Sequence, residues 1–270
     1  MHAFLKLLKW CVVFIVLSVD DARGADYTIS IDVIDNSLFE TDVVVVQIDG
    51  TISQSMAADV ARLSEVRNLS NSGSLLLVLL NSSGGDGEAA ITMGEIFRSL
   101  GAHVFVTGRC DSACVFLLAG GIVRGASAYT VGLHRARIVT ENTGADVNTD
   151  GFSAEVAEHV EILQQFEQRS ADYLEAMGIG EQVQETMLRY QRRTVYRLAL
   201  EELVASNLVG VSIDEFNRVP QSFSANFDEQ ILSRATLKSR ILSVALRCSR
   251  YGQAPNDFAA CYWQRLSRPY

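Results

Sequence analysis

The chain has 270 residues, of which 48% are apolar and 20% charged, with 3 prolines and 19 glycines. This length and composition fit one large domain, or one domain with an extension, and they exclude a disordered, collagen-like or repeat-built chain. The formal net charge is −9 at pH 7. Because nucleic-acid binding needs a basic surface, we expect no nucleic-acid partner.

Residues 1–25 are typical of a secretory signal peptide. Two lysines precede an apolar stretch from Trp10 to Val19, and small residues follow at Gly24 and Ala25. The apolar stretch is shorter than the roughly 20 residues that span a membrane, so an uncleaved anchor is the less favoured alternative. We expect cleavage after Gly24 or Ala25, no stable membrane span in the mature protein, and a periplasmic or secreted location.

Four cysteines remain after this cleavage, an even number in an exported chain, so disulfide bonds are expected. A bond between Cys248 and Cys261 would close a short loop and stabilise the fold by roughly 2–4 kcal/mol, and the alternative is two buried thiols. Cys110 and Cys114 would close a tighter loop. Their alternatives are buried thiols or a metal site with His134, but the chain has no second close cysteine pair, so we expect no metal.

The first half of the mature chain alternates apolar strand-like runs with segments of helical spacing. Residues 27–34 alternate as in a strand, and residues 42–48 and 74–80 are continuous apolar runs typical of strands that are covered on both faces. A repeated strand, helix, strand order predicts parallel pairing and an α/β fold. The expected elements are, in chain order, strands and helices at 27–34 (strand), 42–48 (strand), 53–69 (helix), 74–80 (strand), 89–100 (helix), 103–107 (strand), 113–119 (helix) and 129–133 (strand).

The second half is predominantly helical in pattern. A polar loop at 139–151 precedes a long amphipathic helix at 152–177, and three further helical segments follow at 181–190, 198–207 and 226–247. We therefore divide the chain into a signal peptide, an α/β domain and a helical C-terminal appendage with a possible disulfide. Their expected bounds are 1–25, 26–220 and 221–270.

Unusual residues follow three of the predicted parallel strands, at the edge of an α/β sheet where ligands bind. A serine becomes nucleophilic when a neighbouring base takes its proton, and Ser112 and His134 fit that pair. Main-chain amides at Gly84, Gly85 and Ala113 fit an oxyanion hole, because glycines allow the backbone to approach a substrate closely. The alternatives are a serine that caps the following helix and a histidine with a structural role.

In order and spacing, residues 81–85, 108–120 and 133–134 resemble the Clp protease catalytic subunit and its wider Clp/crotonase superfamily, in particular exported Clp-like proteins of unknown substrate. The resemblance covers about 42–210. It implies repeated ββα units around a parallel sheet, with Ser112 as nucleophile, His134 as base and Gly84 or Gly85 in the oxyanion hole. The family's usual proline in the glycine loop is Ser83 here.

One departure from the family concerns the aspartate that orients the histidine, because that position falls near Gln191. Asp172 or Glu185 could replace it, or a glutamine or a backbone carbonyl could hold the imidazole. A serine–lysine mechanism is disfavoured, since Lys238 is the only lysine left after export and lies outside the matched region.

These features predict an exported serine hydrolase that acts on a peptide or another acyl substrate and needs no cofactor. We also expect a homo-oligomer, because in the resembled family helix 152–177 extends into subunit contacts. The alternatives are a catalytically inactive Clp-like scaffold or binding protein in the cell envelope and, less favoured, an acyl-thioester enzyme. Asp86 and Asp111 are expected as loop caps or substrate-facing charges, and Arg135 and Arg137 as contacts for an acidic group or an oligomer neighbour.

Overall fold

The structure is a computed structural model, and the predicted α/β class with a mostly parallel sheet is confirmed. The signal segment (apart from two residues), the polar loop at 139–151 and Gln191 lie outside the described residues, so the structure does not test those predictions. The described residues are 15–16, 26–34, 42–66, 74–138, 154–190, 194–212 and 234–267.

Strands and helices alternate through the first half of the chain, as the sequence predicts, and helices dominate the second half. Among the described residues of the second half, the elements that were not predicted as such are short strands at Tyr196–Arg197 and Gly210–Val211, a 3-10 turn at Ser249–Tyr251 and a final helix at Pro255–Ser267. In chain order the elements are β1 (Ile15–Val16), β2 (Tyr27–Ile34), β3 (Val43–Gly50), α1 (Gln54–Val66), β4 (Leu75–Ser82), α2 (Gly87–Ser99), β5 (His103–Asp111), α3 (Cys114–Gly120), β6 (Val123–Gly125), β7 (Val131–Leu133), α4 (Ala154–Ala176), α5 (Gln182–Arg189), β8 (Tyr196–Arg197), α6 (Leu200–Ala205), β9 (Gly210–Val211), α9 (Arg234–Cys248), η1 (Ser249–Tyr251) and α10 (Pro255–Ser267).

The strands form one sheet in the order β1-β2-β3-β4-β5-β6-β9. Strands β3, β4, β5 and β6 are parallel, and antiparallel strands lie at both edges. Strand β5 pairs with β6 near its amino end and with a second parallel neighbour, β7, near its carboxyl end. Strand β7 in turn pairs antiparallel with β8. The sheet therefore splits beside the end of β5.

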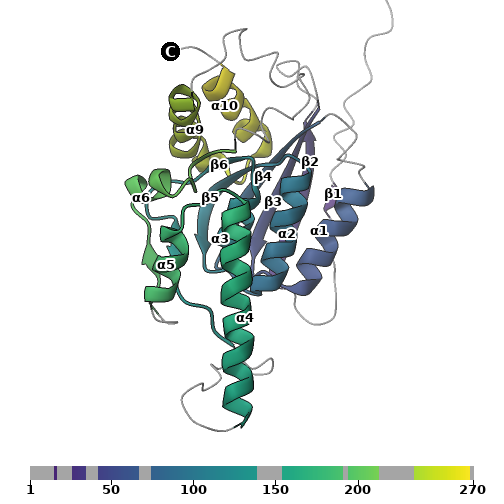
Figure 1. Cartoon of the computed structure of the whole chain (residues 1–270). Coiled ribbons are helices and arrows are strands. Elements are labelled where there is room, and N and C mark those ends of the chain that lie inside the picture. Colours follow the sequence, from purple (N-terminus) through teal and green to yellow (C-terminus); the bar gives the residue numbers. More distant parts are fainter. Residues whose placement is uncertain are drawn as a thin grey trace, which may run out of the picture.

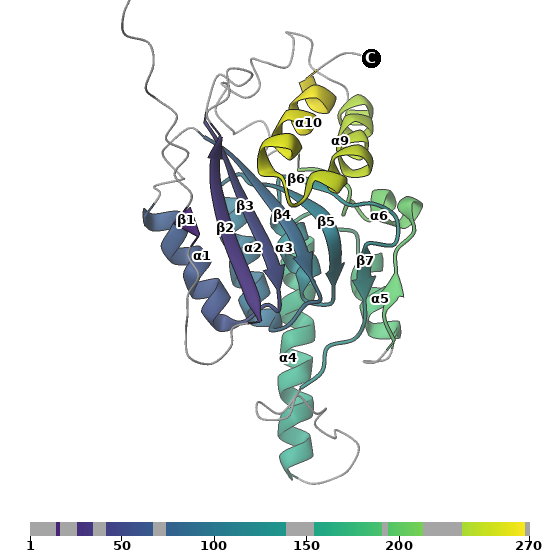
Figure 2. The same cartoon turned by 180° about the vertical axis from the view of Figure 1, so that it is seen from behind.

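Helices cover the two faces of the sheet unequally. Helices α1, α2 and α3 lie on one face (Figure 1), and α9 and α10 cover part of the other (Figure 2). The carboxyl-terminal half of α4 packs on the first layer, where the Phe166 and Tyr173 rings lie 6.1 and 5.9 Å from the ring of Phe116. The other half of α4 extends beyond the sheet.

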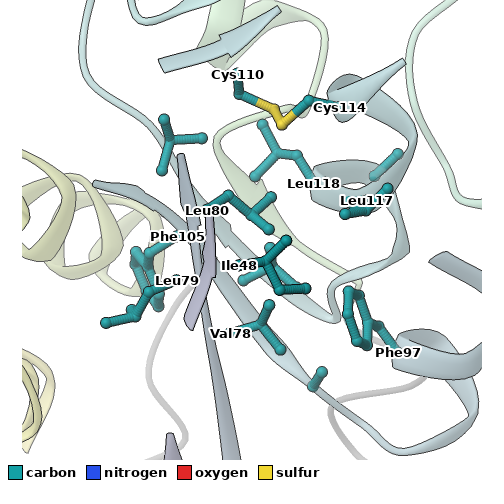
Figure 3. Close-up of a cluster of buried hydrophobic side chains, with 14 of the residues drawn as sticks. Ile48, Val78, Leu79, Leu80, Phe97, Phe105, Cys110, Cys114, Leu117 and Leu118 are labelled. Carbon is teal, nitrogen blue, oxygen red and sulfur yellow. A yellow bond between two sulfur atoms is a disulfide. The ribbon is translucent and has the colours of Figure 1, made fainter. Parts of the chain in front are cut away.

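The core lies between the sheet and its helices. Strands β3 and β4 are buried along six consecutive residues each, which confirms that the two apolar runs are strands covered on both faces. Figure 3 shows side chains of both strands in the cluster, with the Cys110–Cys114 disulfide at one end, next to Leu118.

The carboxyl-terminal helices are tied to the sheet by specific contacts. The predicted Cys248–Cys261 disulfide is present and joins the end of α9 to α10. The Gln47 side chain of β3 donates to the Gly252 carbonyl between the two helices. Inside this layer the fully buried His103 lies 2.6 Å from the Tyr262 hydroxyl, and burial lowers the pKa of His103 to about 3. His103 therefore has a structural role.

Among the residues that the structure describes, no helix combines the length and the apolar character needed to cross a membrane.

Candidate functional site

The loops that carry the predicted site residues meet at one edge of the sheet. Ser82 of β4 pairs with Cys110 of β5, and Asp111 of β5 pairs with Gly132 of β7. All three strands run parallel, so the residues that follow them emerge on the same side. The structure thereby brings together the backbones of the glycine loop, the Ser112 turn and the His134 segment.

Ser112 occupies a tight turn between β5 and α3. Its φ angle is 57°, in the left-handed region that non-glycine residues rarely adopt. Its N–H donates to the Gly132 carbonyl at 2.8 Å. Ser112 is half-buried while every other residue of 110–121 is buried, and within the described chain its hydroxyl has no hydrogen-bond partner.

A capping role for Ser112 is not what the structure shows. The residue at the N-cap position of α3 is Ala113, and no side chain caps the helix there. As far as the described residues show, the Ser112 hydroxyl at the start of α3 therefore makes no structural hydrogen bond.

The two predicted oxyanion glycines differ in geometry. Gly84 has φ +95°, and a Cβ atom on it would lie 2.7 Å from the Ser112 Cβ, so its backbone rests directly against the serine turn. The Gly84 N–H already donates to the Ser82 hydroxyl at 3.0 Å. The N–H groups of Gly85 and Ala113 donate to no acceptor among the described residues. The amides still available to an oxyanion are therefore those of Gly85 and Ala113.

The predicted Cys110–Cys114 disulfide is present and spans the Ser112 turn, with a Cα–Cα distance of 5.1 Å. Both cysteines are fully buried. Because their sulfurs are bonded to each other, they are not free to act as thiolate ligands, which argues against the alternative of a metal site with His134. The bond fixes the two residues on either side of the turn relative to each other.

Asp111 differs from the expectation of a loop cap or substrate-facing charge. The residue is 6% exposed, and its carboxylate accepts two hydrogen bonds of 3.0 Å from Arg197 of β8. The same guanidinium donates to the Tyr129 carbonyl at 3.1 Å. This ion pair joins the residue before Ser112 to the strand beside β7. Asp86, by contrast, has one of the two roles that the sequence suggested. It caps α2, because its side chain accepts a hydrogen bond from the Ala89 N–H.

His134 follows β7 and is half-buried, and its Nδ1 lies 2.8 Å from the carbonyl oxygen of Arg135. Among the described residues it makes no hydrogen bond to Ser112. Of the acids considered as replacements for the family's aspartate, Asp172 accepts from Gln168 on the exposed side of α4 and Glu185 is exposed on α5. Neither forms a hydrogen bond with His134, and among the described residues the group that holds the imidazole is the backbone carbonyl of Arg135.

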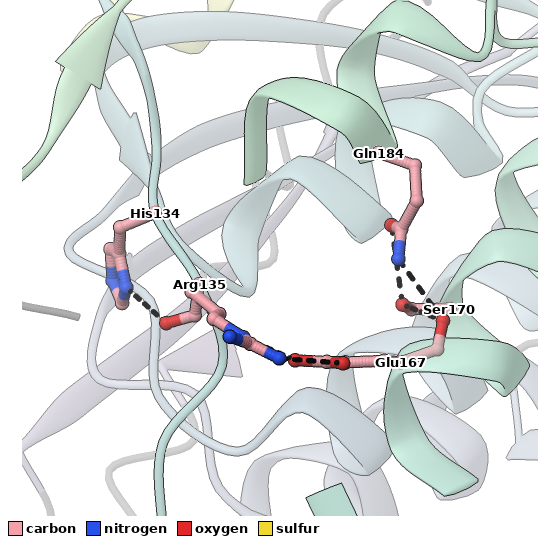
Figure 4. Close-up of polar contacts among 5 residues, drawn as sticks. All are labelled: His134, Arg135, Glu167, Ser170 and Gln184. Carbon is pink, nitrogen blue, oxygen red and sulfur yellow. Dashed lines mark hydrogen bonds and ion pairs between the residues drawn. The ribbon is translucent and has the colours of Figure 1, made fainter. Parts of the chain in front are cut away.

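Arg135 has a partner within its own chain, where the sequence suggested an acidic group or an oligomer neighbour. Figure 4 shows its guanidinium in a two-pronged contact with Glu167 of α4, with N–O distances of 2.7 and 3.2 Å. The hydrogen bond to Glu167 raises the pKa of Arg135, so the guanidinium stays charged at neutral pH. Sequence reasoning missed Glu167 and Arg197, because neither carries a local pattern that separates it from an ordinary solvated side chain.

No protein-family model matches the sequence, and no curated protein matches it significantly. Among solved structures, one similar chain is a mutant of ClpP1 from Listeria monocytogenes, which is 18% identical with a TM-score of 0.43. The match covers 61% of this chain and 88% of that one. At that level of similarity, the function has to be inferred from this chain's own residues.

Proposed function

We propose that this protein is an exported serine hydrolase that cleaves a peptide or another acyl substrate. Ser112 is the nucleophile, His134 the general base, and the Gly85 and Ala113 amides the oxyanion hole. The observation that carries the proposal is the Ser112 turn itself. Its half-buried hydroxyl has no hydrogen-bond partner among the described residues and belongs to a left-handed residue at the carboxyl edge of the sheet. Backbone outliers of this kind concentrate at functional sites.

The reaction follows from these groups. His134 takes the hydroxyl proton while the Ser112 Oγ bonds to the substrate carbonyl carbon, and the carbonyl oxygen gains the negative charge that the two amides stabilise. Collapse of this intermediate breaks the bond to the leaving group, which receives the proton from the imidazolium. Water then attacks the acyl-enzyme by the same route and restores the serine.

The second candidate is an inactive scaffold of the same fold. Two observations favour it: the absence of a Ser112–His134 hydrogen bond among the described residues, and the absence of a carboxylate on the imidazole. Catalytic hydrogen bonds are often long before substrate binds, so the first observation is weaker than the second.

The sequence resemblance supports three finer proposals. The domain at 26–220 belongs to the Clp/crotonase class, with 221–270 added to it, and the repeated β–α order from β3 to β6 agrees with that class. The chain self-associates through the extending half of α4, where Ile162 is exposed. The protein is exported, which is compatible with its two disulfides.

A fluorophosphonate probe tests the hydrolase directly, because it forms a covalent bond with an activated serine. We expect mass spectrometry to map the label to Ser112, and we expect no label in Ser112→Ala or His134→Ala. Ser83→Ala is the matched control, since Ser83 is exposed in the neighbouring glycine loop. A folded wild-type protein that takes up no label would favour the scaffold.

A further inference from the structure

We propose that Arg135 is the positioning residue of the site, replacing an orienting acid. Its carbonyl oxygen fixes the tautomer of His134, and its guanidinium anchors that carbonyl to Glu167 on α4. The consequence for catalysis rests on the proposed hydrolase function, but the consequence for the histidine tautomer does not.

The tautomer follows from the chemistry of the 2.8 Å contact. A carbonyl oxygen only accepts hydrogen bonds, so the His134 Nδ1 must carry the hydrogen that it donates to Arg135. A neutral imidazole has one N–H, and the lone pair is then on Nε2. That is the nitrogen a general base presents to a serine when an orienting group holds Nδ1.

The carbonyl can do this only if the Arg135 backbone is itself fixed, and two contacts fix it. The Arg135 N–H donates to the Tyr190 carbonyl at 3.0 Å. Its guanidinium forms the two-pronged contact with Glu167, which matches the planar geometry of a carboxylate. The residue is therefore held from its main chain and from its side chain.

Glu167 can hold Arg135 in place because hydrogen bonds fix the turn of α4 to which Glu167 belongs. Its carbonyl accepts hydrogen bonds from Ser170 at 2.9 Å and from Gln184 of α5 at 3.1 Å (Figure 4). The neighbouring Phe166 packs against the ring of Phe116 in α3, the helix that follows Ser112. The segment that carries His134 and the helix that follows Ser112 therefore both contact the same stretch of α4.

The test uses Glu167→Gln, which removes the charge of the anchor but keeps its shape. Glu88→Gln is a matched control, because Glu88 of α2 forms another ion pair to this part of α4, with Arg169 at 2.9 Å. Arg135→Lys keeps the charge and the carbonyl but loses the two-pronged contact. Thermal unfolding of each variant establishes that it is folded.

Nitrogen-15 NMR of the histidines measures the tautomer of His134 directly. If Arg135 had only a structural role, this tautomer would be the same in all the variants. The chain has four histidines, and loss of a signal in His134→Ala assigns the relevant one. We expect wild-type His134 to be protonated at Nδ1 and bare at Nε2. In Glu167→Gln we expect the tautomer mixture of a free imidazole and about tenfold slower fluorophosphonate labelling, with a smaller effect in Arg135→Lys and none in Glu88→Gln.

The outcomes separate this inference from the hydrolase proposal. An Nε2-protonated His134 in the wild type, or a Glu167→Gln variant with wild-type tautomer and labelling rate, overturns the role of Arg135 even if Ser112 is reactive. If the wild type takes up no label, the hydrolase proposal fails, and the tautomer in wild type and Glu167→Gln still decides whether Arg135 orients the ring.

Discussion

Replacing Gly84 by alanine should damage both the stability and the reactivity of the Ser112 turn. The residue has φ +95°, where an L-residue loses about 1–2 kcal/mol relative to glycine. The added Cβ would also lie 2.6 Å from the Asp111 carbonyl oxygen and 2.7 Å from the Ser112 Cβ. Both neighbours belong to the disulfide-closed turn, which cannot yield freely, so overpacking adds about 1–3 kcal/mol.

Gly178 separates these two contributions. It has φ +70°, but nothing lies within 4 Å of the position its Cβ would take. We therefore expect Gly178→Ala to lower the free energy of unfolding by about 1–2 kcal/mol and Gly84→Ala by about 2–5 kcal/mol, as measured by urea denaturation. Only Gly84→Ala should also slow labelling of Ser112. Equal losses in the two variants, with full labelling in both, would refute the close approach of the glycine loop to the serine.

Three further predictions concern the framework around the site. Replacing both Cys248 and Cys261 by alanine should lower the free energy of unfolding by about 3 kcal/mol, the entropy of the loop they close, and should leave the melting temperature sensitive to reductant only through the Cys110–Cys114 bond. Asp111→Asn should cost about 1–2 kcal/mol, and a double-mutant cycle with Arg197→Gln should show strong coupling if the buried carboxylate relies on that guanidinium. The pKa of His103 is about 3 in the folded state and 6.5 in the unfolded state. Between pH 3 and pH 6.5 the unfolded chain therefore binds a proton that the folded chain does not. The stability that the neutral, buried His103 contributes should be complete above pH 6.5 and should be lost as the pH falls, by up to about 1.4 kcal/mol per pH unit. In denaturation curves measured at several pH values, His103→Leu should reduce this dependence of the free energy of unfolding on pH.

The elements built on long, uniform patterns could be predicted from the sequence, and those set by tertiary contacts could not. The apolar runs at 42–48 and 74–80 are β3 and β4 because both faces are covered. Helix α10 is not predicted because the segment between Cys248 and Cys261 is expected to be a short loop, whereas Pro255 occupies the first position of the helix, where its missing N–H costs nothing. Strand β6 was missed because Arg124 at its centre is buried, its guanidinium donating to the carbonyls of Ala119, Gly121 and Met177.

The same division applies to the candidate site. The glycine loop, Ser112 and His134 were found because each follows a predicted strand and because their order resembles a family. The ion pairs that support them join residues 32 and 86 positions apart. A glutamate on an amphipathic helix has no local pattern that distinguishes an ion-paired side chain from a solvated one. Only the fold shows that Glu167 faces Arg135.

The choice of serine at position 112 can be tested as a trade-off between stability and chemistry. At φ 57° a glycine would relieve about 1–2 kcal/mol of backbone strain and lose about 0.5–1 kcal/mol through the greater entropy of the unfolded chain. Ser112→Gly should therefore be as stable as the wild type or up to about 1.5 kcal/mol more stable, whereas Ser112→Ala, which keeps the Cβ, should lie within about 0.5 kcal/mol of it.

Both variants should lose fluorophosphonate labelling completely while keeping the disulfide across the turn. A backbone that tolerates glycine better than serine has no structural need for the hydroxyl, so the strained serine is retained for what its oxygen does. If instead both substitutions lower the free energy of unfolding by more than about 1 kcal/mol, the hydroxyl has a structural partner and the main argument for a nucleophile at this position is lost.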